Sequence, residues 1–552
     1  MIAALIMTAL LAATPEASSP ADLVLVSAKI WTGNPASPEA EALAVKNGRI
    51  VAVGRNADVE KLKGPKTVVI DGKGRRVVPG LIDCHTHMSM GGLDLLAMDL
   101  RKTKDPAEFT ATVAAYAKKQ PPGIWLTDGA WDHEQWTPPR LPTKADLDPA
   151  TGDHPTCLQR QDGHMMVCNG LALKLGGVDK NTPDPAGGVI VRDSAGNPTG
   201  VLKDEAMDLV WKVRPPRTKE EIVAGLKAAV AHATKNGVTS VQDLPGSKLD
   251  LPGWDEIRKS GGLTVRVNYR PSIVDWQAAK KAQTDYKQDE WLKVGGVKGF
   301  MDGALGAGTA VMFEPFSDDP GNTGKYAAEA IPLSKIEERI AGADAAGLQV
   351  EVHAIGDKAI AELFDIFARV AQKNGPKDRR FRIEHAQHLR RAEVPKFAAQ
   401  GVIASMQPYH AVDDGRWADR RLGVGTERRL GTYAFRWLLD AKATVAFGSD
   451  WDVAPISPIL GIAAAVTRAT IDGKQPGGWV PEQKIKPEEA LKAYTVTAAY
   501  AAFEEKEKGS LEIGRLGDFV VLSDDPLSVR PEAIEKIQVD ATVVGGRVVY
   551  QR

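Results

Sequence analysis

The apolar segment that begins at Pro79 ends at two histidines, His85 and His87, which are spaced one residue apart. In a β-strand, residues i and i+2 project from the same face, so the two imidazoles can converge on one ion. This is a metal-ligand geometry. A lone His-x-His pair is more often a polar pair on a protein surface, so the rest of the chain must supply further ligands.

Three more candidate ligands stand at the ends of apolar, strand-like segments. The segments 348–352, 381–384 and 443–449 run into His353, His385 and Asp450, respectively. The intervening stretches 334–346 and 357–374 have apolar residues near helical spacing. This alternation predicts repeated β-α units and hence a parallel sheet or barrel. Because the carboxyl ends of the strands in a (β/α)8 barrel meet at one face, ligands far apart in the sequence become neighbours.

Lys298 lies in another apolar segment, 296–301, which is followed by a glycine-rich loop. Burying a lysine as an ammonium ion is costly, so the side chain must be exposed, paired or chemically altered. One interpretation is a salt bridge to Asp302 or to a neighbouring carboxylate. The other is that CO2 has added to the deprotonated amine. The resulting carbamate is an anionic oxygen ligand able to bridge two cations.

Six segments together resemble one enzyme family. They are PGLIDCHTHM from residue 79, GVKGFMDGALG from 296, VEVHAIGD from 350, RIEHAQH from 382, SMQPYH from 405 and GSDWDV from 448. In this order they resemble the metal-dependent amidohydrolase superfamily, and specifically its YtcJ-like branch (amidohydrolase family 3) related to N-substituted formamide deformylase. The resemblance covers nearly the whole chain after about the first 20 residues.

The resemblance implies a dinuclear metal centre, and no departure from the family's ligand pattern is visible. By this resemblance His85, His87 and Asp450 hold one metal, His353 and His385 hold the other, and Lys298, as its carbamate, bridges them. The implied cofactors are two divalent metal ions, with Zn²⁺ expected, and the CO2-derived carbamate. We assign Asp83 to local support of the strand end rather than to metal binding.

Two divalent cations that share a water make hydroxide available near neutral pH, and this hydroxide can attack a carbonyl carbon. Asp450 can accept the water's proton and return it to the departing nitrogen. The expected reaction is hydrolysis of a carbon–nitrogen bond other than a peptide bond, in an amide, N-acyl or N-formyl compound. Hydrolysis of a lactone or ester at the same site is an alternative.

Two other classes of function remain open. A mononuclear deaminase of the same superfamily would not need Lys298 and would usually carry a glutamate soon after the third histidine, whereas His353 is followed by Ala-Ile-Gly-Asp. A non-catalytic binding protein is the second alternative, and the full ligand set argues against it. Metal content distinguishes the three classes, with about two, one or no ions per chain.

A long insertion, about 90–217, can cover the mouth of the barrel and shape a substrate pocket. Its segment 160–164 resembles a motif of this branch, and we assign His164 a catalytic role in stabilising the developing oxyanion. The candidate substrate-binding residues are Trp131, Arg160, Asp162, Asp302, Gln407, His410 and Trp451. The sequence does not identify the substrate.

The chain of 552 residues exceeds a barrel of about 250 residues, so additional parts are expected. Segments in 21–78 and 507–552 alternate apolar and polar residues, with Asn-Gly, Asp-Gly and Gly-Gly turns. The predicted fold is therefore an α/β (β/α)8 TIM-like barrel, residues 79–506, with a composite β-sandwich domain from both ends of the chain.

The composition limits the kinds of binding partner that the protein can have. The 70 basic and 71 acidic residues give a formal charge of −1, and no basic cluster with interleaved aromatics indicates nucleic acid binding. Three cysteines cannot make a disulfide framework and lack zinc-finger spacing. We expect a small-molecule substrate and no membrane-spanning segment in the mature chain, and the sequence leaves a homo-oligomer open.

Residues 1–13 are apolar and uncharged, and the following residues to Pro20 are small or polar. This resembles a secretory signal peptide, residues 1–20, although the start of the segment lacks Lys and Arg. A short membrane anchor is the alternative, but the apolar run is shorter than the roughly 20 residues that span a bilayer. We expect an exported, periplasmic enzyme.

Overall fold

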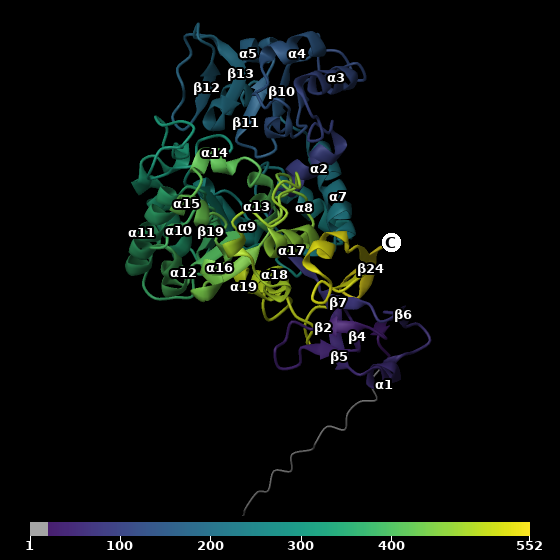
Figure 1. The fold of residues 1–552 in the computed structure, drawn as a ribbon. Helices are drawn as coiled ribbons and strands as arrows, with labels where there is room; N and C mark the ends of the chain where they lie inside the picture. Colours follow the sequence, from purple (N-terminus) through teal and green to yellow (C-terminus); the bar gives the residue numbers. More distant parts are fainter. Residues whose placement is uncertain (1–19) are drawn as a thin grey trace, which may run out of the picture.

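The computed structural model describes residues 20–552 of the chain (Figure 1). The expected signal peptide, residues 1–20, therefore lies outside the described residues except for Pro20. Among the described residues, no helix has both the length and the apolar character that crossing a bilayer requires.

Two parallel sheets form the centre of the molecule. The first has the order β16 (Leu292–Val294), β15 (Arg266–Tyr269), β14 (Val238–Asp243), β8 (Leu81–Thr86). The second has the order β17 (Gly296–Phe300), β18 (Gln349–Ala354), β19 (Arg382–His385), β20 (Ile403–Met406), β21 (Thr444–Phe447). Isolated parallel bridges between Thr86 and Trp451 and between Ser272 and Lys298 connect the edges of the two sheets. The α/β class predicted from the sequence is confirmed.

The central strands are buried on both faces because helices follow them along the chain. Every residue of β8, β14 and β18 is buried, as expected for parallel strands covered on both sides. The covering helices include α7 (Lys219–Lys235), α8 (Asp250–Lys259), α9 (Trp276–Asp285), α10 (Leu333–Ala345), α11 (Asp357–Asn374), α12 (Val394–Gln400), α16 (Phe435–Asp440) and α17 (Pro458–Thr467). The helices expected at 334–346 and 357–374 correspond to α10 and α11, which bury apolar faces against the sheet.

Strands from both ends of the chain share one sheet. Its order is β24 (Arg547–Gln551), β23 (Val539–Val544), β22 (Phe519–Leu522), β7 (Arg76–Pro79), β2 (Lys29–Trp31), β3 (Glu39–Ala40). A neighbouring sheet contains β5 (Arg49–Gly54), β4 (Ala42–Lys46), β1 (Leu23–Val26) and β6 (Val68–Asp71). Side chains of both sheets, among them Leu43 and Phe519, belong to one buried apolar cluster. These strands lie below the central sheets in Figure 1.

The insertion forms a small sheet of its own at the opposite end of the molecule (Figure 1). The order is β12 (Val189–Arg192), β13 (Pro198–Lys203), β11 (Met165–Cys168), β10 (Thr156–Gln159), β9 (Leu126–Thr127), with α3 (Pro106–Ala117), α4 (Lys144–Thr151) and α5 (Gly170–Leu175) beside it. Cys157 and Cys168 are directly opposite each other on β10 and β11 and form a disulfide. Cys84 is a buried free thiol.

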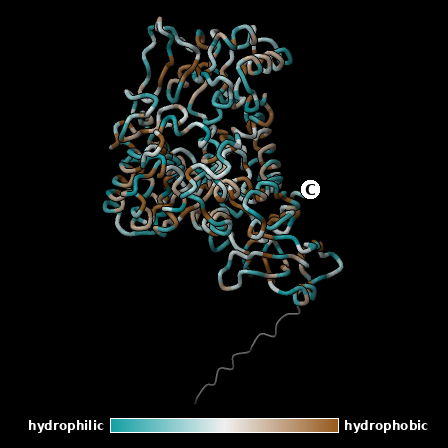
Figure 2. The backbone as a smooth tube through the Cα atoms, viewed as in Figure 1, coloured by the Kyte–Doolittle hydropathy of each residue, from teal (hydrophilic) through white to brown (hydrophobic). Residues whose placement is uncertain are grey.

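The chain returns from the insertion to the central sheets at α7. Thr218 caps this helix by accepting a hydrogen bond from the N–H of Glu221, whose side chain bonds back to the N–H of Thr218. This capping box fixes where α7 begins. Figure 2 shows hydrophobic and hydrophilic residues alternating along the chain, as expected when most elements bury one face.

Candidate functional site

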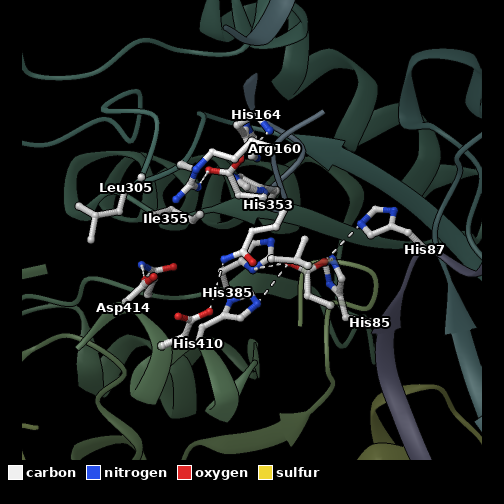
Figure 3. Close-up of a pocket in the computed structure, with 18 of the residues that line it drawn as sticks. His85, His87, Arg160, His164, Leu305, His353, Ile355, His385, His410 and Asp414 are labelled. Carbon is white, nitrogen blue, oxygen red and sulfur yellow. Dashed lines mark hydrogen bonds and ion pairs between the residues drawn. The ribbon is translucent and has the colours of Figure 1, made fainter. Parts of the chain in front are cut away.

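The predicted ligands meet at the carboxyl ends of the central strands (Figure 3). They line one cavity of about 90 Å³, together with residues of the insertion and of the loops that follow the strands. Members that come from strand ends are His85, His87, Lys298, His353, His385 and Asp450. The strand order therefore brings together residues that are hundreds of positions apart in the sequence.

Asp450 lies between two groups of histidines. Its Oδ1 is 3.2 Å from Nε2 of His85 and 3.3 Å from Nε2 of His87. Its Oδ2 is 3.9 Å from Nδ1 of His385 and 3.8 Å from Nε2 of His410. Each group, completed by Asp450, has its candidate ligand atoms within 4.8 Å of one another. One carboxylate thus presents one oxygen to His85 and His87 and the other to His385 and His410, whereas His353, a predicted ligand of the second cation, belongs to neither group.

Neighbouring residues occupy one ring nitrogen in each of three predicted histidine ligands and leave the other nitrogen available to bind a cation. Glu384 contacts Nδ1 of His85, and Oε1 of Gln407 lies 2.9 Å from Nδ1 of His385. The carbonyl oxygen of Gly303 lies 3.1 Å from Nε2 of His353. These contacts leave Nε2 of His85, Nε2 of His385 and Nδ1 of His353 for a cation. Such partners are what metal-binding histidines require to hold their tautomer and ring orientation.

Glu384 is part of a fully buried charge network. Arg382 donates a hydrogen bond of 2.8 Å from Nε to Oε1 of Glu384 and also faces Glu351 at 3.1 Å. Burial opposes ionisation, but the charge of Arg382 and the contact with His85 lower the pKa of Glu384 to about 2. Glu384 is therefore an anion that supports the ligand position of His85.

Lys298 is fully buried beside this network, with only 1% of its surface exposed. Its Nζ lies 3.5 Å from Nε2 of His85 and 4.5 Å from the ring centroid of Phe300. Within the described residues it forms no ion pair with Asp302, whose oxygens accept hydrogen bonds from the N–H groups of Val311, Ile355 and Gly356. Burial lowers the pKa of Lys298, which favours the neutral amine that reacts with CO2.

Two of the predicted ligands have unusual backbone conformations. His385 and Asp450 have φ values of 71° and 58°, in the left-handed region that non-glycine residues rarely adopt. Asp83 supports the turn at Asp450, because its Oδ1 accepts hydrogen bonds from the N–H groups of His85 and Ser449. Strained conformations of this kind cluster at functional sites.

Arg160 and His164 reach the cavity from the tip of the β10–β11 hairpin, above His353 in Figure 3. Arg160 pairs with Asp162 and, at 3.0 Å, with Asp132. Nδ1 of His164 lies 2.7 Å from Oδ1 of Asp204, and its ring centroid is 5.3 Å from that of His353. Burial lowers the pKa of His164, but the hydrogen bond and charge of Asp204 outweigh it and raise the pKa to about 9.

The structure places only some of the predicted substrate contacts at this cavity. Arg160, Asp162, His164 and His410 line it. The side chains that do not line it are Trp131, Asp302, Gln407 and Trp451. The indole of Trp131 donates to the carbonyl of Leu158, and Gln407 supports His385 from behind. The carbonyl of Trp451 accepts from the N–H of His87.

Sequence reasoning missed three residues of this site. Glu384 precedes His385 within a quoted motif, so its position in a strand beside a ligand was a usable signal. Glu384 lies behind His85, whereas Asp413 and Asp414 line the cavity itself, from the end of α13 (Pro408–Asp414). Burial raises the pKa of Asp414 to about 7, against a hydrogen bond from Tyr433. Nothing in the sequence separates these two carboxylates from other helical aspartates.

The donor set fits divalent cations. Burial is the main cause that lowers the pKa values of His353 and His385 well below the usual range, so both are neutral imidazoles, the form that binds metal. Nδ1 of His87 and Nε2 of His410 are buried without a hydrogen-bond partner. Imidazole and carboxylate ligands of this kind suit Zn²⁺ and related ions.

Comparison with known proteins identifies the family. Residues 68–550 match the amidohydrolase family. The protein LONG AFTER FAR-RED 3 of Arabidopsis thaliana is 38% identical over 551 residues, which is 97% of this chain and 93% of that protein. The putative amidohydrolase YtcJ of Bacillus subtilis (strain 168) is 30% identical over 521 residues, covering 93% and 96%. N-substituted formamide deformylase of Arthrobacter pascens is 26% identical over 546 residues, covering 96% and 98%.

Solved structures share the fold. An uncharacterized metal-dependent hydrolase from Pyrococcus horikoshii OT3 superimposes with a TM-score of 0.73 at 28% identity, covering 92% of this chain and 99% of that one. An adenosine deaminase from Xanthomonas campestris with bound zinc, at 17% identity, shares the fold with a TM-score of 0.56 over 96% of this chain and 93% of that one. The chain therefore belongs to the amidohydrolase family, in the branch of YtcJ and N-substituted formamide deformylase, and is a metal-dependent hydrolase of carbon–nitrogen bonds.

Proposed function

We propose that this protein is a dinuclear metal hydrolase that cleaves the carbon–nitrogen bond of an amide, N-acyl or N-formyl compound other than a peptide. His85, His87 and Asp450 hold one cation, and His353 and His385 hold the other. Lys298, as its carbamate, would supply an oxygen ligand to both. The observation that carries this proposal is the convergence of these six residues on one cavity, in which Oδ1 of Asp450 faces His85 and His87 and its Oδ2 faces His385.

The surroundings of Lys298 support the carbamate. Carbamate formation joins the neutral amine to CO2 and releases one proton, so it requires a lysine whose ammonium form is disfavoured. Lys298 is buried, lacks an ion-pair partner among the described residues and lies 3.5 Å from a ligand atom of His85. A mononuclear deaminase has no use for such a lysine, which favours the dinuclear centre over that alternative.

The chain's own residues supply the proton transfers and the orientation of the substrate. Bound divalent cations lower the pKa of water and polarise a carbonyl group. Asp450 accepts the proton of the attacking water and returns it to the departing nitrogen. His164, held above His353 by the insertion, donates a hydrogen bond to the oxygen on which negative charge develops.

The substrate class rests on the relatives. N-substituted formamide deformylase is 26% identical over 96% of this chain, and its name specifies an N-formyl amide. We extend that class to N-acyl compounds generally, because the same attack on a carbonyl carbon serves both. Lactones and esters are the alternative substrates, since their carbonyl carbons are open to the same nucleophile.

Zinc is the proposed metal. The imidazole and carboxylate ligands match its preferences, and zinc is bound in the Xanthomonas campestris deaminase that shares this fold. A carbamate adds a further oxygen ligand. Manganese and nickel accept similar donor sets, so metal analysis must accompany any activity assay.

We also propose the domain organisation. The two parallel sheets close into a (β/α)8 barrel within residues 79–506, and the edge bridges at Trp451 and Lys298 support this closure. Residues 21–78 and 507–552 form a composite β-sandwich, supported by the sheet in which β22 pairs with β7. Residues of about 90–217 form the lid over the barrel mouth.

Export to the periplasm is the proposed location. The disulfide between Cys157 and Cys168 supports it, because disulfides persist in oxidising compartments and are rare in the cytosol. The membrane-anchored alternative gives the same compartment for the folded part of the chain. Fractionation of cells that express the full chain separates the two, since only the anchored form sediments with membranes.

A substrate panel tests the proposed function. Purified, zinc-loaded protein is assayed against N-formyl amines, N-acyl amino acids, dipeptides and lactones, with His385→Ala as the variant that lacks one metal ligand. Release of an amine together with a carboxylic acid, absent in the variant, is the expected result. Exclusive hydrolysis of lactones, or release of ammonia from a ring-bound amino group, would replace the proposed reaction with one of its alternatives.

A further inference from the structure

We propose that Asp204 is the positioning residue of His164: it fixes the orientation of this imidazole, so that Nε2 faces the reacting atoms. This inference rests on the proposed catalytic role of His164. It assigns a second residue of the insertion to the reaction, one that lies outside the family motifs quoted above.

The backbone brings the two residues together. Strands β11 and β13 pair antiparallel, with Met165 opposite Lys203, and one step further along this register His164 lies opposite Asp204. The N–H of Asp204 donates a hydrogen bond of 3.0 Å to the carbonyl of His164. The pairing of two strands therefore sets the distance of 2.7 Å between Nδ1 of His164 and Oδ1 of Asp204.

Asp204 has a strained backbone conformation, and one of its carboxylate oxygens has no hydrogen-bond partner. Its φ is 48°, in the left-handed region, although it is not a glycine. Its Oδ2 is buried and has no hydrogen-bond partner. A side chain placed only for stability would use both carboxylate oxygens, because a buried acceptor without a partner is destabilising. Features of this kind point to a functional requirement.

The loop below Asp204 is shaped to receive its side chain. A Cβ at Gly303 would lie 3.1 Å from Oδ1 of Asp204 and would overlap the side chain of Thr309. The carbonyl of Gly303 is also the partner of Nε2 of His353. The same glycine thus supports the ligand His353 and leaves room for Asp204, so the orientation of His164 is tied to the metal centre.

A carboxylate at Nδ1 has a definite chemical consequence. It accepts a hydrogen bond from Nδ1–H, so that Nε2 is turned toward the substrate, and it holds the ring against rotation. Asp204 faces His164 from the 3-10 helix η3 (Asp204–Met207) that follows β13, and Asp162 and His353 face it from the hairpin and from β18. Without Asp204 the ring can turn, although its place in the cavity remains.

The alternative is a structural contact that closes the small sheet of the insertion. A double-mutant cycle separates the two, using Asp204→Asn, His164→Ala and the combination, with Asp208→Asn as the matched control. Asp208 is an exposed carboxylate. Together with Asp204 it lines a second cavity beside the proposed site, and it does not contact His164. Metal content and melting temperature are measured for every variant.

We expect Asp204→Asn to keep both metals and to lower kcat by roughly 10²-fold with little change in KM. In the His164→Ala background the same substitution should cost nothing further, and Asp208→Asn should behave as wild type. A loss that persists in the His164→Ala background, or one that appears as a lower melting temperature with unchanged kcat, would overturn the role of Asp204.

A spectroscopic measurement decides the matter independently of turnover. In ¹⁵N-histidine-labelled, zinc-loaded protein, Asp204→Asn should shift the Nδ1 and Nε2 signals of His164 and remove its slowly exchanging Nδ1–H proton. Unchanged signals would overturn the inference even where the enzyme is active. If the substrate panel shows no hydrolysis while the signals change, the proposed function fails and the contact between Asp204 and His164 stands.

Discussion

Glu384 contacts Nδ1 of His85, a residue 299 positions earlier in the chain, and it does so from the strand that carries the ligand His385. One strand therefore supplies a ligand to one cation position and the supporting carboxylate for the other. Arg382, two residues before Glu384, holds the second oxygen of this carboxylate. The two halves of the proposed centre are coupled through these contacts.

Replacing Glu384 should weaken metal binding and have only a small effect on the fold. Glu384→Gln keeps the size of the side chain but removes the charge at His85, and loss of such an outer partner typically costs about 10- to 100-fold in metal affinity. Competition with a chelator measures the affinity. Glu337→Gln, which breaks only an exposed pair with Arg369, is the control. Equal metal affinity in the Glu384→Gln and Glu337→Gln variants would show that Glu384 does not support metal binding.

Lys298→Ala should abolish activity and lower the metal content, because it removes the bridging oxygens. Added short-chain carboxylates are expected to restore part of the rate by replacing those oxygens. Lys298→Arg should be no better, since a guanidinium cannot form the carbamate and places a fixed positive charge beside the cations. Elemental analysis and a rate assay check both variants. An alanine variant that keeps full activity and its metals would eliminate the bridge.

Asp450→Asn distinguishes the role of Asp450 as a metal ligand from its role as a proton acceptor. The amide retains an oxygen near the metal but cannot accept a proton, so kcat should fall by roughly 10²-fold or more. Metal occupancy should change less than in Lys298→Ala. Steady-state kinetics with measured metal content provide the comparison. A near wild-type kcat would assign proton transfer to another group.

The disulfide of the insertion should stabilise the hairpin that carries Arg160 and His164. Replacing Cys157 and Cys168 together by serine is expected to cost about 2–4 kcal/mol of unfolding free energy for a short loop. Thiol titration of the unfolded, oxidised wild type should find one free thiol, that of Cys84. Three free thiols in protein isolated from the periplasm would contradict the pairing.

A buried carboxylate predicts a pH-dependent stability. Burial raises the pKa of Asp250 from 3.8 to about 6, although Oδ2 accepts hydrogen bonds from Gly246 and Ser247. Its folded-state pKa exceeds the unfolded value, so its contribution is fully present below about pH 4 and is lost as the pH rises through about 6.

Asp250→Asn mimics the protonated carboxyl at every pH. Relative to wild type, the variant should gain up to about 3 kcal/mol above pH 7 and much less near pH 4. Denaturant unfolding of both proteins between pH 5 and 8 measures the difference. A difference that does not change with pH would mean that the carboxyl titrates normally in the folded chain.

The sequence predicted the α/β class and the strand ends that carry His85, His353 and His385, because these depend on periodicity and on motifs read along the chain. The sequence did not predict contacts between side chains on elements that are distant along the chain. The pairing of His164 with Asp204 depends on the register of β11 and β13, which are separated by about 30 residues of loops, a helix and another strand.

Side-chain roles within a motif were equally hard to assign. Trp131 and Trp451 had residue types suited to substrate contact, and both are packed away from the cavity. His410 was considered only as a substrate contact, yet its Nε2 lies 3.8 Å from Oδ2 of Asp450. The orientation of each ring is set by tertiary packing, which a single sequence does not specify.

The number of metal ions per chain tests the central claim most directly. Purified protein is stripped with chelator, reloaded with excess zinc in bicarbonate buffer, freed of unbound metal and analysed for zinc and protein. The proposed dinuclear centre predicts about two ions per chain, falling on substitution of Lys298. A stoichiometry of about one, unchanged in Lys298→Ala, would contradict the dinuclear centre.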